Sequence, residues 1–123
     1  IVLGNGSDEL LLLLAQTFIN PGDEVIHAEQ TFSEYESTST IMGAHSMAIP
    51  LKEYQYDLKA ILEAINTRTK IIYICNPNNP TGTIVEQEEI ELFMQQVPGE
   101  ILVVFDEAYG EYVDSSICWK GGI

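Results

Sequence analysis

The chain of 123 residues is strongly acidic, with 19 aspartates and glutamates against 5 lysines and arginines and a formal net charge of -14. This charge argues against nucleic-acid binding and against an anionic membrane surface, because both require a basic face. With 46% hydrophobic and 20% charged residues, the chain has the composition of a globular domain with its own core. No apolar run approaches the roughly 20 residues that cross a bilayer. Two cysteines do not form a disulfide framework, so we expect a reduced, cytoplasmic setting.

Apolar patterning predicts that helices and strands alternate along the chain. A first helix is expected at 7–19, opened by Ser7 or Asp8 as a cap and so apolar that it should be largely buried. Further helices are expected at 31–43, 57–65 and 86–97, and strands at 24–28, 44–51, 69–75 and 100–108. The last two strands are near-continuous apolar runs, which are typical of a parallel sheet covered on both faces. We therefore predict an α/β domain with a mostly parallel sheet and helices on both faces.

Three polar stretches fall at the ends of predicted strands or in the turns that follow: GNGSDE at 4–9, NPNNPTGT at 76–83 and DEAYGEY at 106–112. Ligands of open α/β sheets bind beyond the carboxyl ends of the strands, so the sheet should bring these stretches to one edge. The first stretch opens a helix, where free backbone N–H groups and the helix dipole favour a phosphate. Asp8 and Glu9 would repel a phosphate unless they point away from it. Glu9 also stands where a dinucleotide fingerprint requires its third glycine, so that class of site is not predicted.

The order of GSDE, TF, NPNNPTG and DEAY along the chain resembles the fold-type I aminotransferases, which depend on pyridoxal phosphate (PLP). Within that family, the blocks LGNGSDELL, PNNPTG and DEAYGEY are most similar to the histidinol-phosphate aminotransferases. The resemblance covers residues 3–112. It implies the central part of a PLP-transferase large domain.

The resemblance implies that one end of the site holds the cofactor phosphate. The backbone amides around Gly6, Ser7 and Asp8 would bind it at the helix N-terminus. Phe32 would lie flat against the pyridine ring, in a position that is often tyrosine in relatives, because offset stacking fixes the plane of a bound ring.

The resemblance also implies three polar contacts with the pyridine ring. Asn79 would donate to the phenolic oxygen of the cofactor, and Tyr109 would bond the same oxygen. Asp106 would pair with the protonated ring nitrogen, which keeps the ring an electron acceptor. In relatives the peptide bond before the second proline of the loop is often cis, which here is the Asn79–Pro80 bond.

The Schiff-base lysine of the family is not found in this sequence. In relatives this lysine comes after the strand-end aspartate, in a Ser-Lys motif, and a phosphate-binding arginine follows shortly after. Counted from Asp106, the expected position of the lysine lies beyond Ile123. Lys120 comes too soon after Asp106 and lacks the motif, so the catalytic role is not assigned to it. We therefore expect residues 1–123 to lack the N-terminal arm, the lysine segment and the small C-terminal domain. The chain alone should not transaminate.

The implied activity is transamination between histidinol phosphate and 2-oxoglutarate in histidine biosynthesis, by a homodimer. Two alternatives keep the fold and cofactor: a threonine-phosphate decarboxylase and an aromatic aminotransferase. A third is a non-catalytic α/β domain that binds a phosphate ligand. The sequence after residue 123 in the gene distinguishes that third class, because Ser-Lys followed by arginine supports an enzyme.

Other conspicuous residues are interpreted as structural. Neither His27 nor His45 has a second ligand at metal spacing, so both should be structural or exposed. Glu107 should point to the opposite side from Asp106 in an extended strand. Cys75 is read as a small core residue. Four tyrosines are expected to be packing residues: Tyr35, Tyr54, Tyr56 and Tyr73.

Overall fold

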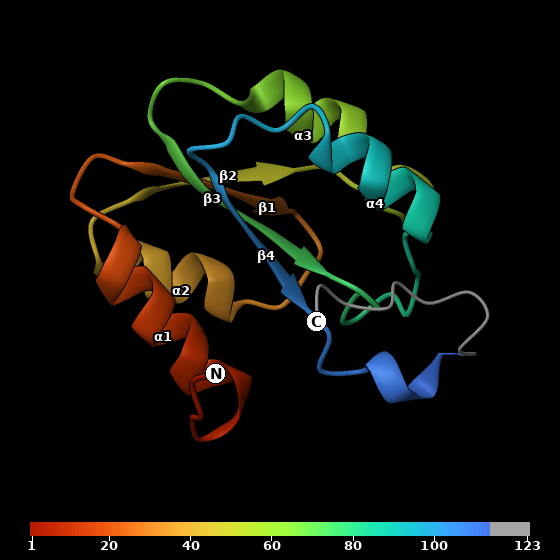
Figure 1. Cartoon of the computed structure of the whole chain (residues 1–123), viewed down its shortest axis with the longest axis horizontal. Helices are drawn as coiled ribbons and strands as arrows, with labels where there is room; N and C mark the ends of the chain where they lie inside the picture. Colours follow the sequence, from red (N-terminus) through yellow and green to blue (C-terminus); the bar gives the residue numbers. More distant parts are fainter. Residues whose placement is uncertain (114–123) are drawn as a thin grey trace.

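Four parallel strands form one sheet in the computed structural model, which describes residues 1–113 (Figure 1). The strands are β1 (Glu24–Ala28), β2 (His45–Ile49), β3 (Thr69–Cys75) and β4 (Leu102–Asp106). Their order across the sheet is β2-β1-β3-β4. The chain therefore starts inside the sheet, moves out to β2, and returns past β1 to β3 and β4. The predicted parallel α/β architecture is confirmed.

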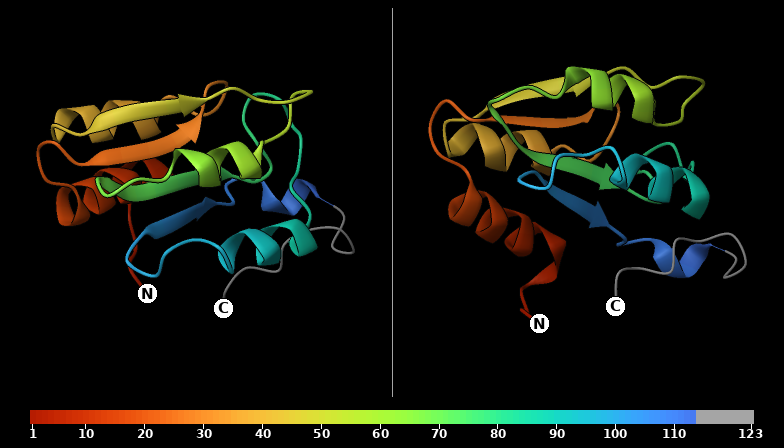
Figure 2. Two further views of the ribbon diagram at one scale, coloured as in Figure 1. Left: turned by 90° about the horizontal axis from the view of Figure 1, so that it is seen from above. Right: turned by 45° about the horizontal axis from the view of Figure 1, so that its top comes forward.

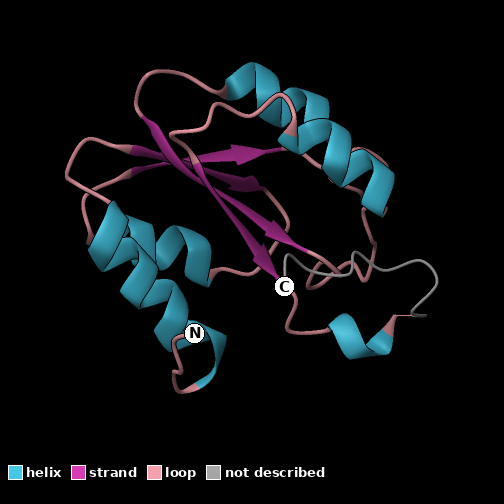
Figure 3. Cartoon of the chain, in the orientation of Figure 1, coloured by secondary structure: helices cyan, strands magenta, loops and turns pink. Residues whose placement is uncertain are grey.

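Helices cover both faces of the sheet, as predicted (Figures 2 and 3). The helices α1 (Gly6–Phe18) and α2 (Glu34–Ile41) lie on one face, and α3 (Leu58–Ala64) and α4 (Gln87–Met94) lie on the other. Right-handed crossovers explain this division. The connection from β1 to β2 crosses the sheet in the opposite direction to the later two, so its helix falls on the opposite face. A short 3-10 helix, η1 (Gly110–Tyr112), follows β4.

Three helix ends show the capping chemistry that is common in proteins. Asp57 caps α3, because its carboxylate accepts a hydrogen bond from the Ala60 N–H at 3.0 Å. Glu86 and Glu89 form a reciprocal capping box at the start of α4. Helix α2 ends just before Gly43, whose φ of +83° lies in the left-handed region.

The start of α1 differs from the prediction. The helix begins at Gly6, with a φ of +76°, and its N-cap residue is Asn5. Ser7 and Asp8 are already inside the first turn, so neither is the cap. The Asn5 side chain makes no capping bond, and the carboxylate of Glu9 reaches back instead to accept from the Asn5 N–H. The left-handed glycine turns the chain into the helix before the predicted caps are reached.

The two inner strands form the centre of the core. Every residue of β1 is buried, and Ile71, Ile72 and Ile74 of β3 are fully buried. Strand β4 is only half-buried along its length, because among the described strands it pairs with β3 alone. A strand lies within the predicted range 100–108, but the prediction that it is buried was wrong.

Helix α1 is less buried than its composition predicts. Leu11 and Ala15 are its buried residues, whereas Leu13 and Phe18 are 40% and 48% exposed. Helix α1 packs on α2 along one side, and its other side faces away from the sheet. The prediction that α1 is largely buried was wrong for this part of its surface. No helix of residues 1–113 combines the length and the apolar character needed to cross a membrane.

Three of the four tyrosines predicted to pack are buried: Tyr35, Tyr56 and Tyr73. Tyr54 is 76% exposed, so its predicted packing role was wrong. It lies with Glu53 in a two-residue turn between Lys52 and Gln55, which exchange backbone hydrogen bonds. Both turn residues have positive φ, which is the geometry of a tight hairpin and carries the Tyr54 side chain outward.

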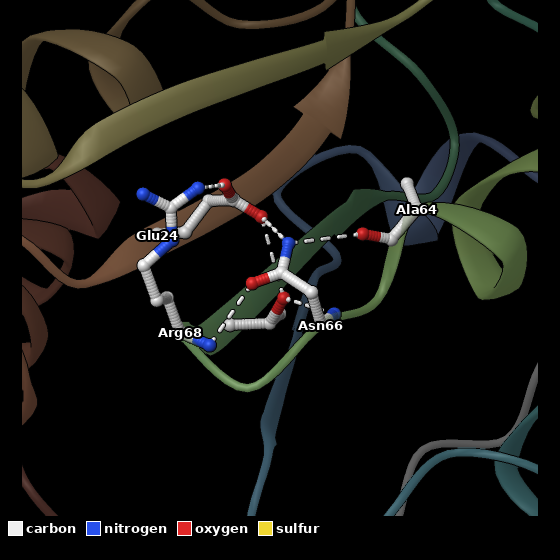
Figure 4. A network of polar contacts seen from close by, with 5 residues as sticks. Glu24, Ala64, Asn66 and Arg68 are labelled. Atoms are coloured by element: carbon white, nitrogen blue, oxygen red, sulfur yellow. Dashed lines mark hydrogen bonds and ion pairs between the residues drawn. The ribbon is translucent and has the colours of Figure 1, made fainter.

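A polar cluster ties the amino ends of β1 and β3 together (Figure 4). Glu24 begins β1 and is 2% exposed. Its carboxylate accepts hydrogen bonds from Asn66 Nδ2 and Thr69 Oγ1 and lies 3.2 Å from Arg68 Nη2. The buried carboxylate is therefore satisfied by three donors. This cluster lies at the edge of the sheet opposite the strand ends that carry the polar motifs.

Candidate functional site

The carboxyl ends of β1 and β3 mark the point where the chain changes direction across the sheet. The two strands are neighbours, but the chain leaves β1 toward β2 and leaves β3 toward β4. Hydrogen bonds join the two loops that follow. Asn78 Oδ1 accepts from Thr31 Oγ1 at 2.7 Å, and Asn78 Nδ2 donates to the Gln30 carbonyl at 2.9 Å. Such a switch point is where open α/β sheets bind ligands.

The loop NPNNPTGT is held by its own asparagines. The Asn76 side chain exchanges two hydrogen bonds with the backbone of Val85, at 2.9 and 3.0 Å, which closes the loop at its base. The Asn78 carbonyl accepts from the Gly82 N–H at 2.7 Å. The predicted cis bond at Asn79–Pro80 is confirmed, and Asn76–Pro77 is also cis. Two asparagines therefore hold the loop, and the half-buried Asn79 is left to face the neighbouring pocket.

Tyr56 connects this loop to the sheet. Its hydroxyl accepts from the Cys75 N–H at 3.0 Å and lies 3.0 Å from Thr31 Oγ1 and 3.4 Å from Asn78 Oδ1. Burial raises the pKa of Tyr56 to about 12, so the phenol stays protonated at neutral pH. The sequence interpretation as a packing residue missed this polar role, which no local pattern around Tyr56 indicates.

A small pocket of about 40 Å³ lies beside this loop, and most of the predicted site residues meet there. The predicted residues Ser7, Phe32, Asn79, Asp106 and Tyr109 line it together with Cys75 and Ala108. These side chains come from α1, from the loops after β1 and β3, and from the end of β4 and the turn after it. The predicted convergence of distant motifs at one sheet edge is therefore confirmed. Gly6 and Asp8 are next to Ser7 in sequence and are not among the lining residues.

The phosphate end of the predicted site is only partly formed. The Gly6 N–H donates to the Gly4 carbonyl at 3.0 Å, so a phosphate that binds there would have to replace this bond. The Glu9 carboxylate already lies against the N-terminus of α1, on the Asn5 N–H. A fixed carboxylate at this position opposes a second anion. Within residues 1–113, no lysine or arginine lines the pocket.

Asp106 ends β4 with both carboxylate oxygens engaged. Oδ2 accepts from the Tyr35 hydroxyl at 2.8 Å, and Oδ1 accepts from the Ala108 N–H at 3.1 Å. Its backbone carbonyl accepts from the Asn76 N–H at 2.9 Å, which joins the end of β4 to the loop after β3. Glu107, the next residue, is exposed and is not a lining residue, as predicted.

Tyr35 is the residue of this site that sequence reasoning missed. It is fully buried in α2 and stacks on Tyr73, with ring centroids 4.8 Å apart and an interplanar angle of 6°. Phe32 meets the Tyr35 ring edge-on at 5.8 Å. Burial, with smaller effects of Cys75 and Asp106, raises the pKa of Tyr35 well above its ordinary value. The i,i+3 spacing of Phe32 and Tyr35 at the start of a predicted helix was the one available signal.

The two histidines lie apart from this site. His27 is buried in β1, with Nδ1 2.7 Å from the Ala28 carbonyl and Nε2 2.6 Å from Ser46 Oγ. The carbonyl requires Nδ1 to donate, so Nε2 accepts from the serine hydroxyl. His45 is exposed at the start of β2. Over the described range, no group of three or more histidine, cysteine, aspartate or glutamate side chains could hold a metal ion.

Comparison with known proteins identifies the family. The family model "Aminotransferase class I and II" matches residues 1–120. The chain belongs to this aminotransferase family. A histidinol-phosphate aminotransferase of Moorella thermoacetica is 50% identical over 113 residues, which is 92% of this chain and 29% of that protein. One from Caldicellulosiruptor saccharolyticus is 52% identical over 114 residues, or 93% of this chain and 32% of that protein.

Solved aminotransferase structures share the fold described above. The histidinol-phosphate aminotransferase of Sinorhizobium meliloti, solved in complex with pyridoxal-5'-phosphate, is 27% identical with a TM-score of 0.86. The match covers 90% of this chain and 30% of that one. The alanine aminotransferase of Pyrococcus furiosus is 29% identical with a TM-score of 0.74, over 84% of this chain and 27% of its own. The chain thus spans less than a third of the length of these family members.

Proposed function

We propose that the whole protein is a PLP-dependent aminotransferase that transfers the amino group of histidinol phosphate to 2-oxoglutarate. The observation that carries this proposal is the meeting of Ser7, Phe32, Asn79, Asp106 and Tyr109 in one pocket at the switch point of the sheet. The substrate is supported by relatives of about half-identical sequence that are named histidinol-phosphate aminotransferases. Residues 1–123 would form the central part of the PLP-binding large domain of a cytoplasmic homodimer.

The side chains around the pocket have the chemistry that the polar edge and the flat ring of PLP would require. Asp106 would pair with the ring nitrogen, since its carboxylate is already fixed at the pocket wall by two donors. The Asn79 amide and the Tyr109 phenol would bind the phenolic oxygen, and the Phe32 ring would pack on one ring face. When bound, PLP supplies an electron sink for a substrate carbanion.

The phosphate group would lie at the N-terminus of α1, near Ser7 and Asp8. The Glu9 carboxylate occupies this end of the helix and would have to release the Asn5 N–H, or a cation from outside residues 1–113 would have to offset its charge. We propose the arginine expected after the Schiff-base lysine as that cation. The Gly6 N–H would join these contacts by leaving the Gly4 carbonyl.

The test is PLP binding and transamination by the whole protein. We expect a PLP absorbance band and 2-oxoglutarate-dependent turnover of histidinol phosphate. Asp106→Ala should lower kcat by at least about a hundredfold, which corresponds to about 2.7 kcal/mol. The matched control is Glu107→Ala, which removes the neighbouring exposed carboxylate and should retain near-normal activity. Preferential turnover of an aromatic amino acid, or release of carbon dioxide from threonine phosphate, would overturn the substrate. Absence of PLP binding would overturn the function and favour a non-catalytic domain.

A further inference from the structure

The Asp106 carboxylate accepts a hydrogen bond from Tyr35, a side chain that does not line the pocket. The Tyr35 hydroxyl lies 2.8 Å from Asp106 Oδ2, and the Ala108 N–H lies 3.1 Å from Oδ1. Within residues 1–113 each carboxylate oxygen has one donor, and the two donors together fix the plane of the group. The backbone donor comes from the same short turn, whereas Tyr35 comes from α2, 71 positions away in sequence. Tyr35 therefore links the Asp106 carboxylate to α2.

The Tyr35 ring is packed on more than one side. It has no exposed surface, and its ring lies parallel to Tyr73 of β3 at a centroid distance of 4.8 Å. The same ring receives Phe32 edge-on at 5.8 Å. Burial raises the pKa of the phenol well above its ordinary value, so Tyr35 stays protonated and can donate across the working pH range. A hydrogen bond from this donor to an ionised carboxylate is shorter and stronger than one between neutral groups.

We propose that Tyr35 is a positioning residue that aims the Asp106 carboxylate at the ring nitrogen of the cofactor and sets the Phe32 ring beside it. This inference rests on the proposed function. One buried side chain then fixes two predicted cofactor contacts that are far apart in sequence. Tyr35 acts through Asp106 and Phe32, and does not touch the cofactor itself. Loss of its hydroxyl should change how the cofactor ring is held more than it changes the fold.

The variants are Tyr35→Phe, which removes only the hydroxyl, and the matched control Tyr73→Phe, which removes the hydroxyl of the stacked ring. The Tyr73 hydroxyl takes no part in the bonds to Asp106. In the whole protein, Tyr35→Phe should raise the Kd for PLP about tenfold, equivalent to about 1.4 kcal/mol, and Tyr73→Phe less than about twofold. The nitrogen-15 NMR signal of the bound, labelled ring nitrogen should move toward that of an unprotonated ring with Tyr35→Phe only.

A double variant separates positioning from general support of the fold. Added to Asp106→Ala, the Tyr35→Phe change should cause no further loss of PLP affinity if Tyr35 acts through that carboxylate. An equal loss in both backgrounds would overturn the inference. A second measurement needs no variant: the NMR signal of the buried Tyr35 hydroxyl proton of the unsubstituted protein should shift when PLP binds. An unchanged signal would also overturn the inference.

The outcomes distinguish the two proposals. If the unsubstituted protein binds PLP and Tyr35→Phe behaves like Tyr73→Phe, the positioning role fails and the proposed function stands. If the unsubstituted protein does not bind PLP, the proposed function fails and the positioning role fails with it. If Tyr35→Phe alone weakens PLP binding and moves the ring-nitrogen signal, both are supported.

Discussion

Replacing Asn78 by alanine should separate the two loops that meet at the switch point of the sheet. Asn78 is 2% exposed and bonds through both ends of its amide. Its oxygen accepts from Thr31 at 2.7 Å and from Tyr56 at 3.4 Å, and its nitrogen donates to the Gln30 carbonyl at 2.9 Å and to Thr81 at 2.8 Å. The substitution removes all four contacts without adding bulk.

The size of the effect follows from these four contacts. A neutral hydrogen bond contributes about 1 kcal/mol net to stability, and a buried group left without a partner costs about 1–3 kcal/mol. The contact with Tyr56 is long and adds little, and Tyr56 and Thr31 keep each other as partners. The Gln30 carbonyl is the acceptor that loses this donor. We therefore expect Asn78→Ala to lower the free energy of unfolding by about 2–4 kcal/mol.

Urea denaturation followed by circular dichroism measures this change as a shift of the midpoint at constant slope. The matched control is Asn20→Ala, because Asn20 is exposed and its amide makes one long contact of 3.5 Å with Asp23. The control should change the free energy of unfolding by less than about 0.5 kcal/mol. If Asn78→Ala is equally mild, the amide does not hold the two loops together and the reasoning is refuted.

Four further results are expected. Gly43→Ala should destabilise the fold by about 1–2 kcal/mol, because the backbone φ there is +83° and the new Cβ would lie 3.2 Å from Pro21. The control Gly99→Ala should be nearly neutral, because its new Cβ meets no atom within 4 Å. Thermal melting compares the two variants. Glu24→Ala should cost about 2–3 kcal/mol, because it removes a buried carboxylate that accepts from Asn66 and Thr69 and pairs with Arg68. Arg68→Ala, at a side chain 60% exposed, should cost less than about 1 kcal/mol in the same urea assay. Tyrosine ionises near pH 10 in the unfolded chain and near pH 12 at Tyr56 in the folded one, so the unfolded state binds fewer protons between these values. Stability should therefore fall as pH rises from about 10 to 12, and less steeply in Tyr56→Phe; a slope that is equal in both proteins would contradict this. The 123-residue chain alone should show no transamination and no borohydride-stable PLP adduct by intact mass, and an adduct at Lys120, which lies outside the described residues, would contradict this.

The inner strands could be predicted from the sequence because the residues that mark them are consecutive in the chain. β1 and β3 begin and end at the predicted residues, since each has adjacent apolar residues between turn-forming residues. The burial of β4 and α1 was predicted wrongly for a different reason. Their exposure depends on which elements lie beside them, and apolar runs do not encode the order of strands in a sheet.

The site divides in the same way. Asn79, Asp106 and Tyr109 lie in or after motifs at strand ends, so their meeting could be predicted from the parallel sheet alone. The hydrogen bond from Tyr35 to Asp106 could not be predicted from the sequence. It requires α2 to pack on the sheet so that Tyr35 reaches the carboxyl end of β4. The hydrogen bond between the Glu9 carboxylate and the Asn5 N–H could not be predicted either, because the direction of the Glu9 side chain depends on where the helix begins.

The pocket is joined by contacts between residues far apart along the chain. Thr31 and Asn78 are 47 positions apart, and Tyr35 and Asp106 are 71 apart. Contacts of such high separation form late, because the entropy of closing a long loop must be offset before they contribute. During synthesis, the first helix and β1 leave the ribosome well before β4 exists to complete the pocket wall. A ligand bound in this pocket would therefore show that the chain through β4 has folded. A chain that is still being synthesised and lacks β4 could not bind it.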